Sequence, residues 1–115
     1  KYLCMQKGKT KFEYTSYKWE FPGGKIEPGE TPQQALAREL MEEMEYPVEV
    51  GEELTTVTHE YPDFSITMTA FLCTPKAEAN GFKRKEHADS KWCCKKELQG
   101  LDWAAADVGV VESIL

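Results

Sequence analysis

Three glutamates on one stretch of the chain carry the clearest chemical signal in the sequence. Glu39, Glu42 and Glu43 are spaced at i, i+3 and i+4, so in a helix they would share one sector of the surface. Like charges at this spacing cost about 0.2–0.5 kcal/mol per pair in an isolated helix, and Arg38 relieves part of that cost because it can pair with Glu42. Carboxylates gathered in this way suit a hard, oxygen-seeking cation such as Mg²⁺. The alternative interpretation is an ordinary solvated acidic face.

The sequence also predicts the helix that would position these glutamates, from Thr31 to Met44. Thr31 is a candidate N-cap, Pro32 stands at the first helical position, and Gln34 follows three residues after the cap. Together they form the pattern of a capping box. Apolar residues then recur at the helical period and predict a face that packs on a core. These residues are Leu36, Leu40 and Met44.

The residues around the helix extend into a longer pattern. From Gly24 the chain reads Gly, five residues, Glu30, seven residues, and then Arg-Glu-Leu-Met-Glu-Glu from Arg38 to Glu43. This pattern resembles the Nudix box, the loop–helix signature of the Nudix hydrolases. The many fixed residue types at fixed gaps make the resemblance specific, and in less detail it extends over nearly the whole chain.

The resemblance departs from the box at its last two positions. The family has glycine and an aliphatic residue there, whereas this chain has Glu45 and Tyr46. Glycine would give the helix a left-handed exit. We therefore expect Glu45 to leave the helix in another way, helped by Pro47, which disfavours helical geometry at the residue before it. None of the carboxylates is removed by this departure.

The resemblance implies roles for the residues of the box. Glu42 and Glu43 would be metal ligands, and Glu39 would be a further ligand or the base that orients the attacking water. Glu30 would support the metal cluster, and Arg38 would orient the glutamates through charge-assisted hydrogen bonds. The implied cofactor is Mg²⁺, with Mn²⁺ as an alternative.

Two further ligands are implied outside the helix. In the family, the carbonyl at the position of Gly23, within Trp-Glu-Phe-Pro-Gly-Gly, binds the metal. Glu86 stands six residues before Trp92, where MutT-like members carry another site glutamate. Glu86 could equally be an exposed loop residue. We interpret the neighbouring His87 as a solvated loop residue, although the Glu-His pair also resembles the CTP pyrophosphohydrolases.

The implied nucleotide pocket rests on fewer residues. Asp107 lies in a segment that resembles the C-terminal segment of the MutT-like nucleotide hydrolases, where an Asn or Asp bonds the base edge. Gly109 stands where the family usually has proline. Asp107 could also be the N-cap of a final helix, and Phe21 is a pocket candidate that could equally belong to the core. The other candidates for substrate binding are Gln6, Gly24 and Lys25.

The resemblance implies a MutT-like enzyme that hydrolyses a nucleoside triphosphate to the monophosphate and pyrophosphate with Mg²⁺. CTP, dCTP and oxidised dGTP are the implied substrates, and the implied task is the removal of damaged or surplus nucleotides. Two alternatives stay open: a Nudix hydrolase of another diphosphate, such as a nucleotide sugar or dinucleotide, and a non-catalytic Nudix module that binds nucleotide or a partner protein. A lost carboxylate would favour the second, but four acidic residues are present: Glu39, Glu42, Glu43 and Glu86.

The composition is that of one globular domain, 1–115. Hydrophobic residues make up 41% of the chain and charged residues 30%, which is ordinary for such a domain. The net charge of −6 argues against a nucleic-acid duplex as partner, and no apolar run is long enough to span a membrane. A small nucleotide is the expected partner, and the chain would be a monomer or a homodimer. The four cysteines lack metal-ligand spacing and are interpreted as reduced packing residues in the cytoplasm: Cys4, Cys73, Cys93 and Cys94.

The remaining patterns predict an α+β fold, and the resemblance implies a mixed β-sheet between helices, an α/β/α sandwich. Members of the family usually have a β-strand before the first one predicted here. We therefore expect this N-terminal strand to be missing from the sequence or displaced. Strands are predicted at 2–6, 48–57 with a bend around Gly51, 64–72 and 91–93, and helical segments at 95–99 and 108–115.

Overall fold

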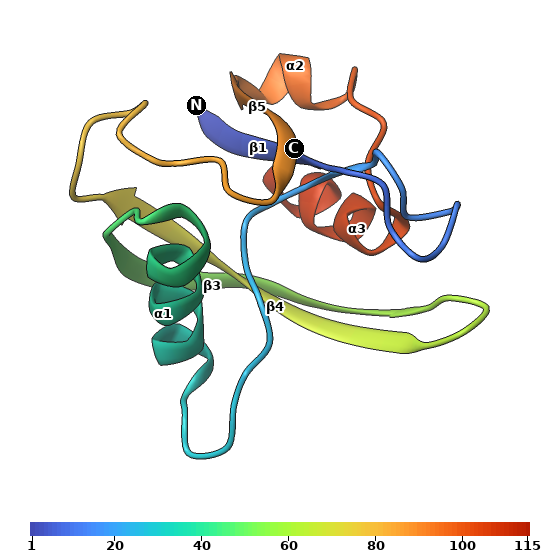
Figure 1. Ribbon diagram of the computed structural model, residues 1–115, viewed down its shortest axis with the longest axis horizontal. Helices are drawn as coiled ribbons and strands as arrows, with labels where there is room; N and C mark the ends of the chain where they lie inside the picture. The colour runs from blue at the N-terminus through green and yellow to red at the C-terminus, as the bar shows by residue number, and fades with distance from the viewer.

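The strands form two separate sheets in the computed structural model, which describes residues 1–115 (Figure 1). β1 (Tyr2–Lys7) pairs antiparallel with β2 (Trp19–Glu20) on one side and with β5 (His87–Cys93) on the other. β3 (Val48–Glu60) and β4 (Ser65–Pro75) form a long antiparallel hairpin. One isolated parallel bridge, between Trp19 and Trp103, makes the pairing mixed.

Three helices pack around these sheets: α1 (Pro32–Met44), α2 (Lys95–Leu98) and α3 (Ala105–Ile114). Because successive side chains of a strand point to opposite faces, the neighbours Cys4 and Met5 are both buried but face different helices. Cys4 packs with side chains of α2 and α3, whereas Met5 packs with side chains of α1. The predicted α+β fold, with a sheet between helices, is therefore confirmed. None of the three helices has the length and apolar character needed to cross a membrane.

β3 and β4 lie where strands were predicted but run further. They continue past the predicted ends at Val57 and Leu72 because the two strands pair with each other along these additional residues. The predicted bend at Gly51 is present as a register irregularity between Val50 and Glu53. A Cβ atom at Gly51 would lie 2.8 Å from the carbonyl oxygen of Leu72, so the close approach of the two strands requires glycine there.

β5 and α3 both begin earlier than predicted. β5 starts at His87 because its polar first half pairs with β1, a contact that local sequence patterning does not reveal. α3 starts at Ala105, with Ala104 as its N-cap. The interpretation of Asp107 as the N-cap is therefore wrong, since Asp107 lies inside the first turn of the helix.

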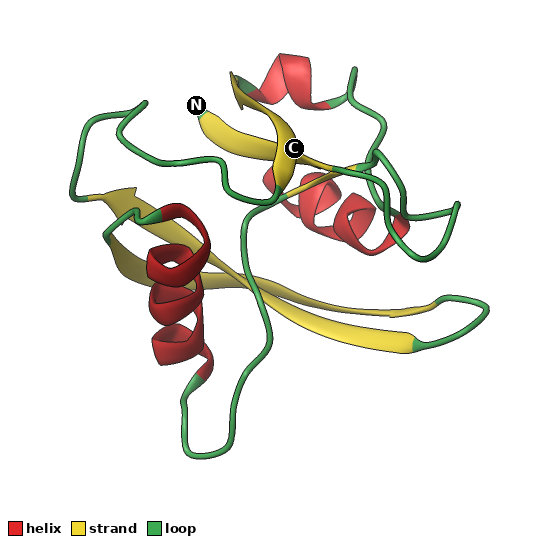
Figure 2. Cartoon of the chain, viewed as in Figure 1, coloured by secondary structure: helices red, strands yellow, loops and turns green.

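α1 begins as predicted. The Thr31 hydroxyl accepts the N–H of Gln34 at 3.1 Å, and the side-chain carbonyl of Gln34 accepts the N–H of Thr31 at 3.0 Å. The capping box is therefore confirmed. The loop of residues 21–31 runs alongside α1 before it turns into the helix (Figure 2). Residues of this loop can therefore reach the acidic face of α1.

The end of α1 differs from the expectation. Glu45 has a φ of 50° and lies in the left-handed region, which is the conformation that the glycine of the box would adopt. Its N–H donates to the carbonyl of Met41 at 3.0 Å, and the N–H of Tyr46 donates to the carbonyl of Leu40 at 3.2 Å. The carboxylate of Glu45 pairs with Lys83 at 3.3 Å and Lys85 at 2.9 Å. The expected alternative exit is wrong, because these closing hydrogen bonds require a left-handed residue whatever its side chain.

We expect Glu45→Gly to stabilise the protein by about 0.5 kcal/mol. The left-handed conformation costs a residue with a Cβ atom about 1–2 kcal/mol. The strain removed by glycine is larger than the losses that the substitution brings. These losses are the entropic cost of glycine, about 0.5–1 kcal/mol, and the small contribution of two exposed ion pairs. Urea unfolding measures the difference. Glu45→Ala is the matched control, because it loses the same ion pairs but keeps the strain, and it should be less stable than the wild type. Equal stability of the two variants would contradict the argument.

Candidate active site

Arg38 lies at the centre of the acidic face of α1 and holds the neighbouring carboxylates. Its Nε and Nη2 donate to the two carboxylate oxygens of Glu30, at 2.6 and 2.9 Å. Its Nη1 donates to Glu39 at 2.9 Å and to Glu42 at 3.0 Å, and its Nη2 also donates to the carbonyl of Lys25 at 3.0 Å. The hydrogen bonds from Arg38 lower the pKa of the Glu30 carboxyl. The guanidinium of Arg38 thus connects the loop before α1 to the acidic face of the helix through hydrogen bonds.

Glu43 is the carboxylate around which other acidic side chains crowd. Burial, then the charge of Glu39 and a hydrogen bond with it, raises the pKa of Glu43 to about 7. Glu86 raises this pKa further, and His87 acts in the opposite direction. Glu42 lies further out, with 61% of its side chain exposed. The structure therefore brings Glu39, Glu43 and Glu86 together and leaves Glu42 at the edge of the group.

Gly23 and Gly24 both lie close to α1, and Gly24 approaches one of its carboxylates. A Cβ atom on Gly24 would lie 2.2 Å from Cδ of Glu39, so the backbone at Gly24 passes directly against this carboxylate. A Cβ atom on Gly23 would lie 3.8 Å from Cδ1 of Leu36 on α1. The absence of a side chain at Gly24 lets the main chain share one site with the glutamates.

The acidic residues fit a hard divalent cation by their chemistry, although they are not gathered into a finished set of ligands. No group of three His, Cys, Asp or Glu side chains is close enough together to hold a metal ion as it stands. Arg38 engages Glu39 and Glu42, and like charges oppose closer approach. The donors are carboxylate oxygens, which Mg²⁺ and Mn²⁺ prefer. The raised pKa of Glu43 marks a place where a cation would be stabilised.

A cavity of about 890 Å³ adjoins these residues and is lined mainly by apolar side chains of α1, β4 and α3. The ring of Phe21 lies in its wall, tilted against the ring of Trp103 at a centroid distance of 4.7 Å. Gln6, predicted to bind substrate, does not line the cavity, because its Nε2 donates to the carbonyl of Tyr17 at 3.0 Å in the loop after β1. The predicted substrate-binding residues that do line it are Phe21, Gly24, Lys25 and Asp107.

Asp107 is a buried carboxyl group in the wall of this cavity, with 5% of its surface exposed. Its Oδ1 accepts the N–H of Phe21 at 3.0 Å. Burial raises the pKa of Asp107 to about 7, and the hydrogen bond from Phe21 acts against this shift while Glu20 adds to it. The carboxyl group is thus fixed beside Phe21 and is protonated more readily than an ordinary aspartate.

We expect Asp107→Asn to be more stable than the wild type above pH 7 and equally stable below about pH 4. The pKa of Asp107 is about 7 in the folded protein against an ordinary value of 3.8, so between these values the folded protein holds one more proton than the unfolded chain. The free energy of unfolding of the wild type therefore falls, relative to the variant, by up to ~1.4 kcal/mol per pH unit in this window. Urea unfolding of both proteins across the window measures the change. A difference that does not vary with pH would show that Asp107 titrates normally.

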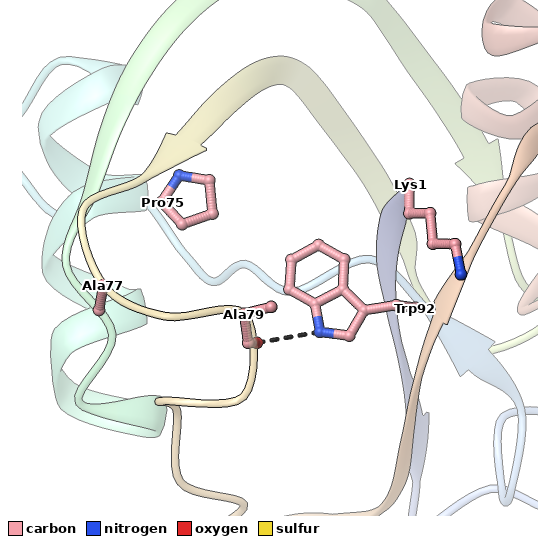
Figure 3. Close-up of a pocket in the computed structure, with 5 residues that line it drawn as sticks. All are labelled: Lys1, Pro75, Ala77, Ala79 and Trp92. Atoms are coloured by element: carbon pink, nitrogen blue, oxygen red, sulfur yellow. Dashed lines mark hydrogen bonds between the residues drawn. The ribbon is translucent and has the colours of Figure 1, made fainter.

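A second pocket, of about 590 Å³, lies between the end of β4 and β5 (Figure 3). The indole N–H of Trp92 donates to the carbonyl of Ala79 at 2.9 Å and so fixes the loop after β4. The wall of this pocket contains no acidic residue, and we place no metal chemistry there. Its residues are Lys1, Pro75, Ala77, Ala79 and Trp92.

Comparison with known proteins identifies the family of the chain. The family model described as NUDIX domain matches residues 1–113. The chain belongs to the Nudix family. The resemblance of the sequence to the Nudix hydrolases is therefore confirmed.

Two relatives and one solved structure show how far the likeness extends. The 8-oxo-dGTP diphosphatase of Proteus vulgaris is 55% identical over 56 residues. These residues are 49% of this chain and 50% of that protein, so the match spans only half of the relative's length. The CTP pyrophosphohydrolase of Escherichia coli (strain K12) is 34% identical over 97 residues, or 84% of this chain and 70% of that protein. The solution structure of the E. coli ORF135 protein matches with a TM-score of 0.78 and 30% identity, and covers 97% of this chain and 77% of that one.

Two polar residues of this Nudix domain were not singled out in the sequence as site residues. Glu20 lines the cavity, and its Oε2 lies 2.9 Å from Nε2 of His87. The interpretation of His87 as a solvated loop residue is wrong, because it begins β5 and its side chain is 9% exposed. The position of Glu20 directly before Phe21 and the glycines could have identified it. Its contact with His87 depends on strand pairing, for which the sequence has no local signal.

Proposed function

We propose that this Nudix hydrolase is a nucleoside triphosphate pyrophosphohydrolase that requires Mg²⁺ or Mn²⁺. Its substrates would be CTP, dCTP or oxidised dGTP, and its products the monophosphate and pyrophosphate. One observation carries the proposal: Gly24 lies against Glu39 and also lines the cavity that holds Phe21 and Asp107. A nucleotide with its base in this cavity would therefore have its phosphates beside the glutamates. The activities named for the two relatives support the same substrates.

The glutamates would form the cation site, and the rest of the chain would fix them. A bound divalent cation neutralises phosphate oxygens and lowers the pKa of a bound water. Arg38, which is anchored by Glu30, restrains Glu39 and so limits the number of arrangements the donors can adopt. The groups proposed to hold the cation are the carboxylates of Glu39, Glu42, Glu43 and Glu86 and the carbonyl of Gly23.

The cavity would bind the nucleoside part of the substrate. Phe21 offers an aromatic surface on which a base can pack, and Asp107 offers a polar group in an otherwise apolar wall. A few polar groups placed among apolar side chains are what orient a small ligand in such a site. Lys25, which also lines the cavity, is placed to interact with phosphate oxygens.

The test is pyrophosphate release from a panel of triphosphates with Mg²⁺: CTP, dCTP, methylated dCTP, dGTP and oxidised dGTP. We expect a clear preference within the panel, with pyrophosphate rather than phosphate as the product. Glu52→Gln, at an exposed position of β3, should retain the activity of the wild type. Hydrolysis of nucleotide sugars or dinucleotides instead would favour the other class of diphosphate. If the folded protein hydrolyses none of these substrates, the result would favour a non-catalytic module that binds nucleotides.

The cavity runs along the edge of β4 rather than over one face. Every residue from Ile66 to Cys73 lines the cavity, and successive residues of a strand face opposite ways. β4 pairs only with β3, and Tyr2 and Leu3 of β1 also line the cavity.

A further inference from the structure

Glu45 connects the end of α1 to the loop of residues 76–86, which leads from β4 to β5 and passes that end of the helix (Figure 1). Its carboxylate pairs with Lys83 at 3.3 Å and with Lys85 at 2.9 Å. Glu45 makes these contacts from a left-handed backbone with a φ of 50°, which is costly for a residue with a Cβ atom. Strain of this kind is retained where the surrounding structure uses it, often at functional sites. The two lysine contacts indicate what the strained residue is used for.

The same two lysines also bind the carbonyls of the last turn of α1. The N–H of Lys83 donates to the carbonyl of Met44 at 2.8 Å, and Nζ of Lys85 donates to the carbonyl of Glu42 at 3.3 Å. The last four carbonyls of a helix have no donor within the helix, and positive charge is favourable at this end. The loop therefore supplies donors and charge that the end of α1 lacks.

Tyr46 holds the same loop from the core side. Its ring meets the ring of Phe82 edge-on at a centroid distance of 5.6 Å, and its hydroxyl donates to the carbonyl of Glu78 at 2.9 Å. The side chain of Tyr46 is buried with side chains of β1 and α1. Glu45 and Tyr46 are the two positions at which the sequence departs from the Nudix box, and both contact this one loop.

The loop ends at Glu86, which is held on both sides along the chain. Lys85, directly before it, pairs with the carboxylate at the end of α1. His87, directly after it, begins β5 and has its Nε2 2.9 Å from Oε2 of Glu20. The charge of Glu86 contributes to the raised pKa of Glu43, which is consistent with a position close to the acidic face of α1. The contacts of Lys85 thus bear on where the Glu86 carboxylate lies.

We propose that Glu45 is a positioning residue, which through Lys83 and Lys85 holds the loop on the end of α1 and so places Glu86 beside the other glutamates of the cation site. We call these three residues the Glu45 cluster. The inference rests on the proposed function, in which Glu86 is a cation ligand. Without the cluster, the loop would have to be ordered when the cation binds, and this ordering lowers affinity. Exposed ion pairs are individually weak, so we expect an effect of several-fold on cation affinity.

Binding of Mn²⁺ alone, measured by calorimetry, tests the cluster without a substrate. Glu45→Gln and Lys85→Met each remove one charge and keep most of the side chain. We expect both to raise the dissociation constant for Mn²⁺ about 3–10-fold. If the two residues acted only through their charge, the effects would have opposite signs, because loss of a nearby positive charge favours cation binding. Tighter or unchanged Mn²⁺ binding by Lys85→Met therefore overturns the proposal.

The matched controls lie at exposed positions outside the cluster. Glu52→Gln on β3 and Lys76→Met at the start of the loop remove the same charges, and both should bind Mn²⁺ as the wild type does. Salt screens exposed ion pairs, so the difference between the wild type and Glu45→Gln should shrink between about 0.05 and 1 M KCl. A difference that persists undiminished at high salt would contradict a role through ion pairs.

Hydrogen exchange in the absence of cations measures the hold on the loop directly. The N–H of Lys83 is bonded to the carbonyl of Met44, and we expect it to exchange about 3–10-fold faster in Glu45→Gln and in Lys85→Met. Exchange as slow as in the wild type in both variants would overturn the proposal, because the loop would then be held without the cluster.

Glu45→Gly separates positioning from stability. This variant loses the carboxylate and also the backbone strain, so it should be more stable than the wild type and yet bind Mn²⁺ as weakly as Glu45→Gln. Wild-type affinity for Mn²⁺ in Glu45→Gly would show that Glu45 serves the fold alone, and would overturn the proposal.

The same measurements keep this inference distinct from the proposed function. If no triphosphate is hydrolysed but Mn²⁺ binds the wild type more tightly than Glu45→Gln and Lys85→Met, the hydrolase proposal fails and the positioning role of Glu45 stands. If the wild type does not bind Mn²⁺, or binds it no better than these variants, the positioning role fails whatever the hydrolysis shows.

Discussion

Glu43→Gln is expected to remove most hydrolysis and, in the absence of divalent cations, to make the protein more stable. The Glu43 carboxyl is partly buried beside Glu39 and Glu86, which raises its pKa to about 7. Above this pH the folded protein holds three crowded negative charges, and the neutral amide removes one of them. The same substitution removes a proposed cation ligand, and we expect a loss of roughly 10²-fold or more in kcat, the scale of a positioned catalytic carboxylate.

The sign of the stability change follows from proton linkage. The pKa of Glu43 lies above its ordinary value of 4.5, so the folded protein binds the proton more tightly than the unfolded chain does. The stability of the cation-free wild type therefore falls as the pH rises from about 4.5 to about 7, and the full penalty is present above that window. Glu43→Gln has no such penalty. Urea unfolding at pH 8 with EDTA should show the variant as the more stable protein.

Adding Mg²⁺ should reverse this order. A cation that binds only the folded state stabilises it in proportion to the logarithm of its concentration over its dissociation constant. The wild type should therefore gain stability with Mg²⁺, whereas Glu43→Gln should gain little. Glu52→Gln, at the exposed control position, should behave as the wild type in both conditions. If Glu43→Gln is the less stable protein in EDTA at pH 8, the carboxylates are not crowded and the cation site must lie elsewhere.

The parts of this site that depend on local sequence were predictable. The capping box of Thr31 and Gln34 involves residues three apart, and the acidic face follows from the helical period, so both could be read from one short segment. The exit through Glu45 was not predictable in the same way. A left-handed glutamate is disfavoured by its Cβ atom, and hydrogen bonds to Leu40 and Met41 override that preference in the folded chain.

The parts that depend on strand pairing could not be read from the sequence. His87 stands in a polar segment that reads as a loop, and only its register against β1 buries it beside Glu20. The sequence predicts Gln6 as a pocket residue, but the loop after β1 supplies the carbonyl of Tyr17 as the partner of its side chain. In both cases a contact between residues distant in sequence determines which partner the side chain binds.

Arg38→Lys is expected to weaken the protein and its response to cations, although it conserves the charge. The guanidinium of Arg38 makes two hydrogen bonds to Glu30 and one each to Glu39 and Glu42. A lysine ammonium is a point charge that cannot reproduce this planar fork. We expect the free energy of unfolding to fall, since the carboxylates lose the paired hydrogen bonds that the guanidinium makes. The Mg²⁺ concentration for half-maximal hydrolysis should rise about 10–100-fold, as when groups that orient metal ligands are removed.

A double-mutant cycle with Glu30→Gln tests whether Arg38 restrains the carboxylates on the acidic face of α1. Glu30 fixes two of the guanidinium nitrogens, so losing either residue should disturb the same carboxylates. The double variant should then need little more Mg²⁺ than Arg38→Lys alone, because the effects of coupled residues do not add. Arg84→Lys, an exposed arginine that contacts Ala88 and Asp89, is the matched control and should keep the cation response of the wild type. Additive effects in the cycle would mean that Arg38 and Glu30 act on the site separately, and the restraint of the glutamates would then need another source.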